Sequence, residues 1–93
     1  MESKAWSIEL KPSASKALGK FPEVVKRRLG EAISKLAEEP RPAGVKKLAG
    51  QNSLYQIRVD DYRIIYQVED QVLTILVIRI GDRKEVYRNL KRL

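Results

Sequence analysis

The chain has 93 residues, of which 43% are apolar and 33% charged, a composition typical of a small folded protein, so residues 1–93 are expected to form a single domain. It holds no cysteine and no histidine, which excludes disulfide bonds, thiol nucleophiles, zinc sites built from Cys and His, and histidine as a catalytic acid or base. Nineteen Lys and Arg residues against twelve Asp and Glu residues give a net charge of +7, which favours an anionic partner, although a solvated basic surface would have the same charge.

No segment predicts a membrane span or a signal peptide. The longest apolar run, residues 72–80, is interrupted by Thr74 and Arg79 and falls far short of the roughly 20 residues that a transmembrane helix needs. The first six residues lack the apolar stretch of a signal peptide. We therefore expect a cytoplasmic protein with no membrane partner, no metal and no cofactor, whose chemistry uses Arg, Lys, Tyr, Asp, Glu, Ser or Thr.

The first forty residues predict one strand and two helices. Apolar and polar residues alternate over residues 6–10, the period of a half-buried strand, which ends before Pro12. Residues 12–19 are expected to form a short helix with Pro in its first turn and Gly at its end. A second helix begins near Pro22 and ends before Pro40, and the two make an antiparallel hairpin. Apolar residues three and four apart give this second helix one continuous stripe: Val25, Leu29, Ala32, Ile33, Leu36 and Ala37.

A loop and three strands follow. Residues 40–50 are rich in Pro and Gly and are expected to form a loop with three positive charges. The period then changes to two, and three strands over residues 54–59, 62–69 and 72–80 are separated by pairs of residues short enough for hairpin turns. The order of elements predicts an α+β fold, in which a small antiparallel β-sheet packs on an N-terminal helical hairpin.

The expected two-residue turns determine which side chains share a face. The first turn places Arg58 opposite Arg63, and the second places Glu69 opposite Val72. The helix-facing core would then contain Tyr55, Ile57, Val59, Tyr62, Ile64, Tyr66, Val68, Leu73, Ile75 and Val77. The other face would expose Leu54, Ile65 and Leu76 at one end and cationic side chains at the other.

The cross-strand arginines are the first candidate site. Like charges directly opposite each other destabilise a sheet unless an anion lies between them, although two arginines splayed into water are the alternative. Gly81 allows a sharp turn that would bring Arg83 near Arg63, with Tyr87 a few residues further on. Arginine matches phosphate oxygens and an aromatic ring stacks on a base, so the group suits RNA.

Three segments carry a family resemblance: LYQIRV (residues 54–59), DYRIIY (61–66) and IRIGDRKEVYR (78–88). In order and spacing they resemble the RelE toxins of bacterial and archaeal toxin–antitoxin pairs, within the RelE/ParE superfamily. The resemblance implies the RelE-like microbial RNase fold, a small antiparallel sheet with two N-terminal helices. It also implies an mRNA interferase that cuts messenger RNA in the ribosomal A site.

The implied reaction is attack of a ribose 2′-hydroxyl on the adjacent phosphate without a metal. It needs an electrostatic clamp on the phosphate, a base and an acid. Matching positions suggest that Arg63 and Arg83 form the clamp or a proton-donating environment, and that Tyr87 stacks on or orients the nucleotide. For the general base, the hypothesis is Tyr87 assisted by the field of Arg58, Arg63 and Arg83, with Lys84 as the alternative.

The chain departs from the best-known members at three positions. Two strand positions that are lysines there are Gln56 and Arg58 here, and the position before Arg83, often His or Lys in relatives, is Asp82. Arg58 keeps the positive charge but is too basic to accept a proton near neutral pH. The departures leave the general base open, and Gln56 and Asp82 favour the alternative of a relative that inhibits DNA gyrase.

The resemblance also implies partners. A cognate antitoxin, acidic and similar to RelB, would silence the toxin, and an apolar strip on it could cover the face around Leu54, Ile65 and Leu76. The other partners are the ribosome and messenger RNA.

The residues expected to bind RNA or the ribosome are Lys46, Lys47, Arg41 and Gln56. Two alternatives stay open at this stage. A relative similar to ParE would inhibit DNA gyrase by binding, and a non-catalytic relative would grip RNA or an acidic protein without turnover.

Overall fold

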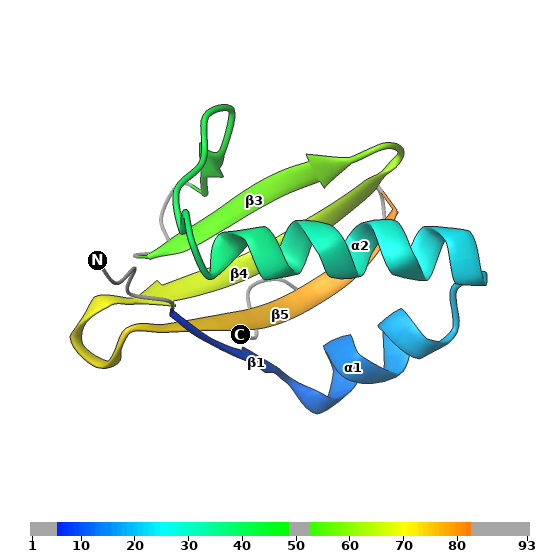
Figure 1. Cartoon of the computed structure of the whole chain (residues 1–93), viewed down its shortest axis with the longest axis horizontal. Helices are drawn as coiled ribbons and strands as arrows, with labels where there is room; N and C mark the ends of the chain where they lie inside the picture. Colours follow the sequence, from blue (N-terminus) through cyan, green and yellow to red (C-terminus); the bar gives the residue numbers. More distant parts are fainter. Residues whose placement is uncertain (1–5, 49–52, 83–93) are drawn as a thin grey trace.

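Five strands of the described part of the chain form one sheet. Both helices cover the same face of it (Figure 1). The computed structural model describes residues 6–48 and 53–82. The strand order across the sheet is β1-β5-β4-β3-β2. The elements are β1 (Ser7–Leu10), α1 (Pro12–Gly19), α2 (Glu23–Leu36), β2 (Lys46–Lys47), β3 (Leu54–Val59), β4 (Tyr62–Glu69), a 3₁₀ turn (Asp70–Val72) and β5 (Thr74–Asp82).

Both predicted helices are confirmed. α1 begins with proline, whose missing N–H is not needed in the first turn, and buries Ala14. The longer α2 buries Leu29, Ile33 and Leu36, which recur every three or four residues and so lie on one side of the helix. Neither helix is long and apolar enough to cross a membrane.

The hairpin of β3 and β4 has the predicted bounds and register. Val59 is paired with Tyr62 and Arg58 with Arg63, so the turn consists of two residues. The first of them, Asp60, has a φ of 56°, in the left-handed region that Asp tolerates better than most residues. This turn presents the two arginines side by side.

The predicted turn between β4 and β5 is wrong. Glu69 lies opposite Thr74 rather than Val72, because a 3₁₀ turn and Leu73 in the left-handed region, with a φ of 47°, lengthen the connection. A shift of two residues returns Ile75 and Val77 to the predicted face. Only Leu73 leaves the predicted core, and its side chain is 43% exposed.

A β-bulge in β5 determines which side chains reach the site. The register between β4 and β5 shifts between Ile65 and Tyr66, so that Ile65 pairs with Arg79 and Tyr66 with Val77. Without this shift Arg79 would lie opposite Ile64 in the helix-facing core. The bulge therefore keeps Arg79 on the other face and places Gly81 opposite Arg63.

The α+β class is confirmed, but the sheet is mixed rather than purely antiparallel. β1 runs parallel to β5, with Ser7 opposite Thr74, because the chain crosses the sheet through both helices before the meander begins. The expected loop of residues 40–50 also contains the short strand β2, which pairs antiparallel with Tyr55 and Gln56.

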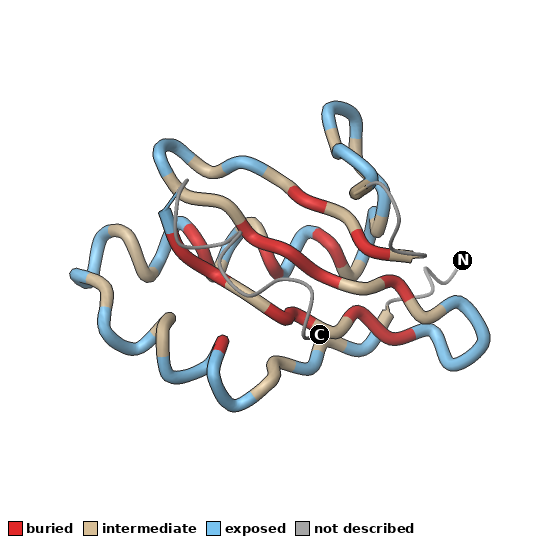
Figure 2. The backbone as a smooth tube through the Cα atoms, turned by 180° about the vertical axis from the view of Figure 1, so that it is seen from behind, coloured by how far each residue is buried: buried red, intermediate tan, exposed pale blue. Residues whose placement is uncertain are grey.

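The core lies between the helices and one face of the sheet. Figure 2 shows the buried positions running along the middle strands. The helix-facing cluster consists of Ala14, Leu29, Ile33, Leu36, Ile64, Tyr66, Val68, Ile75, Val77 and Ile80. Leu54 and Ile65 are also buried, on the opposite face. The expectation that these two side chains form open apolar surface is therefore wrong, while Leu76 is half-buried.

Candidate functional site

Arg58 and Arg63 lie directly opposite each other on the sheet face that points away from the helices. The Val68 amide donates to the Ser53 carbonyl at 3.0 Å, so odd-numbered residues of β3 form the hydrogen bonds to β4. Arg58 and Arg63 are therefore a non-hydrogen-bonded pair, the type in which the two side chains come closest. The register of β3 with β4 therefore places two positive charges next to each other.

Both guanidinium groups donate to main-chain carbonyls, one in the hairpin turn and one at the start of β4. Arg58 Nε donates to the Asp60 carbonyl and Arg63 Nη1 donates to the Tyr62 carbonyl, each at 3.3 Å. Within the described ranges no carboxylate forms an ion pair with either arginine. Several N–H groups thus stay available on two uncompensated charges, an arrangement suited to the oxygens of a phosphate.

The end of β5 lies beside this pair. Gly81 is opposite Arg63 and contributes no side chain there, while Arg79 lies on the same face opposite Ile65. Asp82, the last described residue, pairs with Tyr62. β5 therefore continues past the predicted strand end at residue 80 and runs beside the arginines, and the sharp turn expected at Gly81 is wrong, because Gly81 is paired within the strand.

Three predicted catalytic residues come after this point in the chain. Arg83, Lys84 and Tyr87 lie outside the described residues, and their roles stay predictions. The described part of the site consists of Arg58 and Arg63, which the structure brings together.

The predicted RNA contacts of β2 point to opposite faces. Lys46 pairs with Gln56 and shares the face of Arg58, whereas Lys47 pairs with Tyr55 on the helix side. Both lysines are exposed. Gln56 is only 8% exposed, so little of its side chain reaches the surface beside the arginines.

Arg41, predicted to bind RNA, has protein partners in the structure. Its Nε donates to the Tyr55 hydroxyl at 3.0 Å, and its Nη2 lies 2.9 Å from Asp70 Oδ2. The guanidinium carbon is also 5.3 Å from the centre of the Tyr55 ring, within range of a cation–π contact. These bonds, first that to Tyr55 and then that to Asp70, raise the pKa of Arg41.

This contact is a feature that sequence reasoning missed. Arg41, Tyr55 and Asp70 are far apart in the chain, and no local pattern connects them. The contacts of Arg41 with Tyr55 and Asp70 connect the segment after α2 to the sheet, and we call them the Arg41 strap.

Tyr66 stabilises the Arg41 strap through contacts with the same segment and with Tyr55. Its buried hydroxyl donates to the Pro40 carbonyl at 2.7 Å, and its ring stacks on Tyr55 with 5.9 Å between ring centres. Burial, and then the neighbouring Tyr55, raises the pKa of Tyr66 well above its ordinary value. Tyr66 therefore stays protonated and is a structural donor rather than a base.

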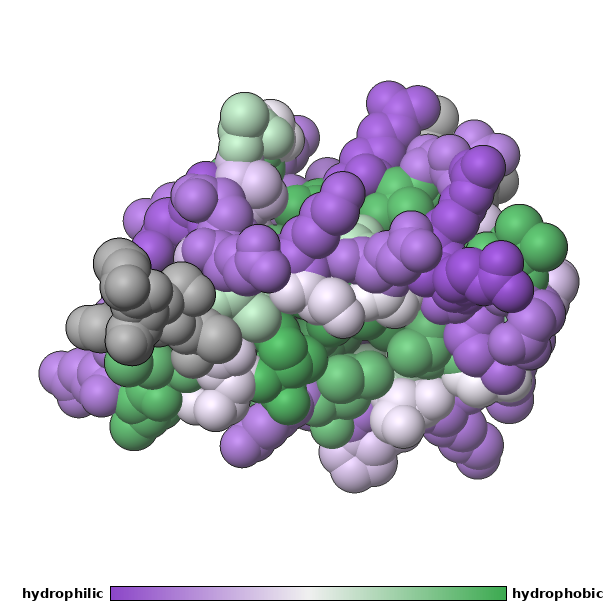
Figure 3. Space-filling model, in the orientation of Figure 1, coloured by the Kyte–Doolittle hydropathy of each residue, from purple (hydrophilic) through white to green (hydrophobic). Residues whose placement is uncertain are grey.

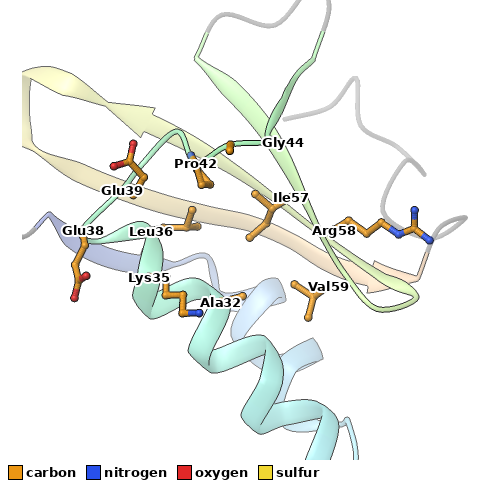
Figure 4. Close-up of a pocket in the computed structure, with 11 residues that line it drawn as sticks. Ala32, Lys35, Leu36, Glu38, Glu39, Pro42, Gly44, Ile57, Arg58 and Val59 are labelled. Atoms are coloured by element: carbon orange, nitrogen blue, oxygen red, sulfur yellow. The ribbon is translucent and has the colours of Figure 1, made fainter.

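An apolar groove of about 560 Å³ lies between α2, the segment after it and β3 (Figure 4). Leu36, Ile57 and Val59 contribute to its apolar lining. The charged residues of its lining are two of each sign, Lys35 and Arg58 against Glu38 and Glu39, so the groove has no net positive charge that would favour phosphate.

Arg58 belongs both to the arginine pair and to the lining of this groove. In Figure 4 the Arg58 side chain points away from the groove residues Ile57 and Val59. Figure 3, which shows the helix side, has hydrophilic side chains over the outer side of α2 and apolar surface between α2 and α1. Of the two sites, the candidate anion site is the arginine pair on the opposite side of the sheet.

Sequence comparison connects the chain to known toxins. Residues 8–87 match the family model described as the ParE toxin of the type II toxin–antitoxin system parDE. The mRNA interferase toxin RelE of Escherichia coli (strain K12) is 31% identical over 87 residues, which cover 89% of this chain and 90% of that protein. Toxin RelG of Mycobacterium tuberculosis is 26% identical over 87 residues, covering 89% and 97%.

Solved structures agree with the sequence matches. A mutant of E. coli toxin RelE in the free state superposes with a TM-score of 0.80 at 30% identity, covering 96% of this chain and 98% of that one. RelE in the archaeal RelE–RelB complex from Pyrococcus horikoshii OT3 gives a TM-score of 0.76 at 30% identity, covering 86% and 97%. The RelE-like fold expected from the sequence is thereby confirmed. With the family model spanning most of its length, this chain belongs to the RelE/ParE family of toxins of type II toxin–antitoxin systems.

Proposed function

We propose that the protein is a ribosome-dependent endoribonuclease that cuts messenger RNA in the ribosomal A site and so inhibits translation. The observation that carries the proposal is the pair Arg58 and Arg63, two charges in register beside β5 that form no ion pair with a carboxylate among residues 6–48 and 53–82. The E. coli relative named mRNA interferase toxin RelE supports the same activity.

The proposed reaction is transesterification within the RNA chain. The ribose 2′-oxygen forms a bond to the adjacent phosphorus as the bond from phosphorus to the 5′-oxygen breaks. A base takes the 2′-hydroxyl proton, an acid protonates the leaving oxygen, and the product carries a cyclic phosphate. Arg58 and Arg63 would stabilise the charge that grows on the phosphate oxygens in the transition state.

The remaining roles follow the family resemblance. Arg83 completes the proposed clamp, and Tyr87 is the proposed base, with Lys84 as the alternative. A Tyr87→Phe variant that retained cleavage would rule Tyr87 out as the base.

The proposed partners are a cognate antitoxin, the ribosome and messenger RNA. E. coli RelE and Pyrococcus horikoshii RelE have been solved in complexes with RelB antitoxins, which supports a RelB-like partner here. The net charge of +7 would attract both an acidic antitoxin and RNA. The exposed Lys46 and Lys47 are the proposed contacts to ribosomal RNA.

The test is primer extension on a defined message in a translating bacterial extract with purified protein. We expect cuts at specific sites that need the ribosome, are absent on naked RNA, and are lost in Arg83→Ala. Intact message in the presence of folded protein would contradict the proposal.

Gyrase inhibition is the second candidate, because the matching family model is that of the ParE toxin. It would leave messenger RNA intact and would block supercoiling of relaxed plasmid by purified gyrase. A protein that binds RNA or an acidic partner but is inactive in both assays would be a non-catalytic relative.

A further inference from the structure

The turn between β3 and β4 is anchored to α2 by a long-range ion pair. Arg28 Nη1 lies 2.5 Å from Asp60 Oδ2, and the two residues are 32 positions apart in the chain. Arg28 is exposed and lies at the edge of the apolar stripe of α2, one helical turn from Val25 and Ala32. The contact joins two exposed side chains outside the core.

Asp60 is linked to Arg58 through a different group. Its main-chain carbonyl accepts the hydrogen bond from Arg58 Nε, while its carboxylate binds Arg28. The backbone of Asp60 is in the left-handed region, with a φ of 56°, so its carbonyl direction depends on how the turn is held. One residue thus connects α2 to the guanidinium of Arg58.

The anchor also opposes a repulsion. Arg58 and Arg63 are like charges on a non-hydrogen-bonded pair, and in the absence of an anion they push each other apart. β2 pairs with β3 only at Tyr55 and Gln56, so no described strand supports Arg58 from the other side. Besides the pairing of β3 with β4, the turn is what supports Arg58, through the hydrogen bond from its Nε to the Asp60 carbonyl.

We propose that Asp60 is a positioning residue for Arg58, with Arg28 as the anchor that holds it. This inference rests on the proposed function, in which Arg58 and Arg63 bind the scissile phosphate. The ion pair fixes the turn, the Asp60 carbonyl fixes Nε, and the terminal N–H groups of Arg58 are left facing the same side as Arg63. The pair is thereby organised before RNA arrives.

Asp60→Asn separates positioning from simple electrostatics. Asn also tolerates the left-handed region, so the change removes mainly the charge that binds Arg28. It adds one to the net charge of +7, so electrostatic attraction alone would strengthen RNA binding. If Asp60 positions Arg58, the cleavage rate of Asp60→Asn should instead fall.

The experiment is single-turnover cleavage of a defined message on programmed ribosomes, with the toxin concentration varied. For Asp60→Asn we expect the rate at saturation to fall about tenfold, with the half-saturating concentration unchanged or lower. Arg28→Ala should lose the same rate, the double variant should be no slower than either single variant, and Arg28→Lys should recover most of it.

Arg27→Ala is the matched control. It removes the same charge from the next position of α2, where no ion pair is formed with a described residue, and should keep the saturated rate within about twofold of the parent. Because Arg28 and Asp60 are 59% and 51% exposed, the variants should melt within about 4 °C of the parent. If Asp60→Asn and Arg28→Ala cleave at the parent rate, the inference is wrong. It is also wrong if Arg27→Ala loses as much of the saturated cleavage rate as they do.

A readout without RNA distinguishes this inference from the proposed function. Hydrogen exchange at Arg58 Nε, followed by NMR on the free protein, should be several-fold faster in Asp60→Asn and Arg28→Ala than in the parent. If the parent does not cleave RNA but exchange rises in both variants, the proposed function fails and the turn still positions Arg58. If exchange is unchanged, the positioning inference fails whether or not the parent cleaves.

Discussion

Arg63 holds the central place in the candidate site, between Arg58 on β3 and Gly81 on β5. We expect Arg63→Ala to lower ribosome-dependent cleavage about 100-fold or more, because it removes donors that would face the transition-state charge. Stability should be unchanged or slightly higher, since a like-charge pair is relieved. Primer extension and thermal melting measure the two effects.

Gln67→Ala is the control for this prediction. Gln67 lies on the same face of β4, two pairs beyond Ile65, and is half-buried like Arg63. Cleavage should stay near the parent rate in this variant. Equal losses in the two variants would mean that damage to β4, rather than loss of the guanidinium, slows the reaction.

Tyr66 makes a pH-dependent contribution to stability. Its pKa in the folded protein lies above the value of about 10 in the unfolded chain, so above pH 10 the unfolded state releases the proton first and is favoured. The contribution is fully present below pH 10 and is lost as pH rises further.

Tyr66→Phe tests that contribution. At pH 9 the variant should be less stable by about 1 kcal/mol, because the bond to the Pro40 carbonyl is lost. The difference from the parent should narrow at pH 11, as measured by urea unfolding at both pH values. A difference that widens would contradict the sign of the pKa shift.

At the scale of elements, β2 separates two neighbouring lysines. Lys46 shares the face of Arg58, whereas Lys47 points to the helix side. We therefore expect Lys46→Glu to weaken ribosome binding and to reduce its salt dependence by about one unit of slope, as for loss of one phosphate contact. Binding measured at several salt concentrations gives the slope.

Lys47→Glu makes the same change of charge on the other face, and the comparison shows which of the two proposed RNA contacts contributes more. A smaller effect than that of Lys46→Glu is expected. Equal effects would show that β2 acts through total charge rather than through the face shared with Arg58.

Local patterns predicted the elements that depend on neighbouring residues. The bounds of β3 and β4 and the Arg58–Arg63 register follow from alternation and a two-residue turn. The longer turn before β5 depends on Leu73 in the left-handed region, a conformation that leucine does not signal. The Arg41 strap could not be predicted, because Arg41, Tyr55 and Asp70 are brought together only by the fold.

At the scale of the whole molecule, contacts between residues far apart in the chain could not be predicted from the sequence. The parallel register of β1 with β5 joins residues more than sixty positions apart, and no turn residue encodes it. The same holds for the ion pair between Arg28 and Asp60. The sequence therefore predicted the arginine pair but not the contact that anchors its turn.

The edge position of β1 has a consequence for the order in which the molecule assembles. β3, β4 and β5 form a meander of local pairings whose loops close early, whereas β1 joins β5 only after a much longer loop has closed. Docking of this four-residue strand is thus expected to be a late folding step and its release an early opening event. In native-state hydrogen exchange, the amides of β1 should lose protection at lower denaturant than those of β4, so that the protein first opens at the side of the sheet opposite β2.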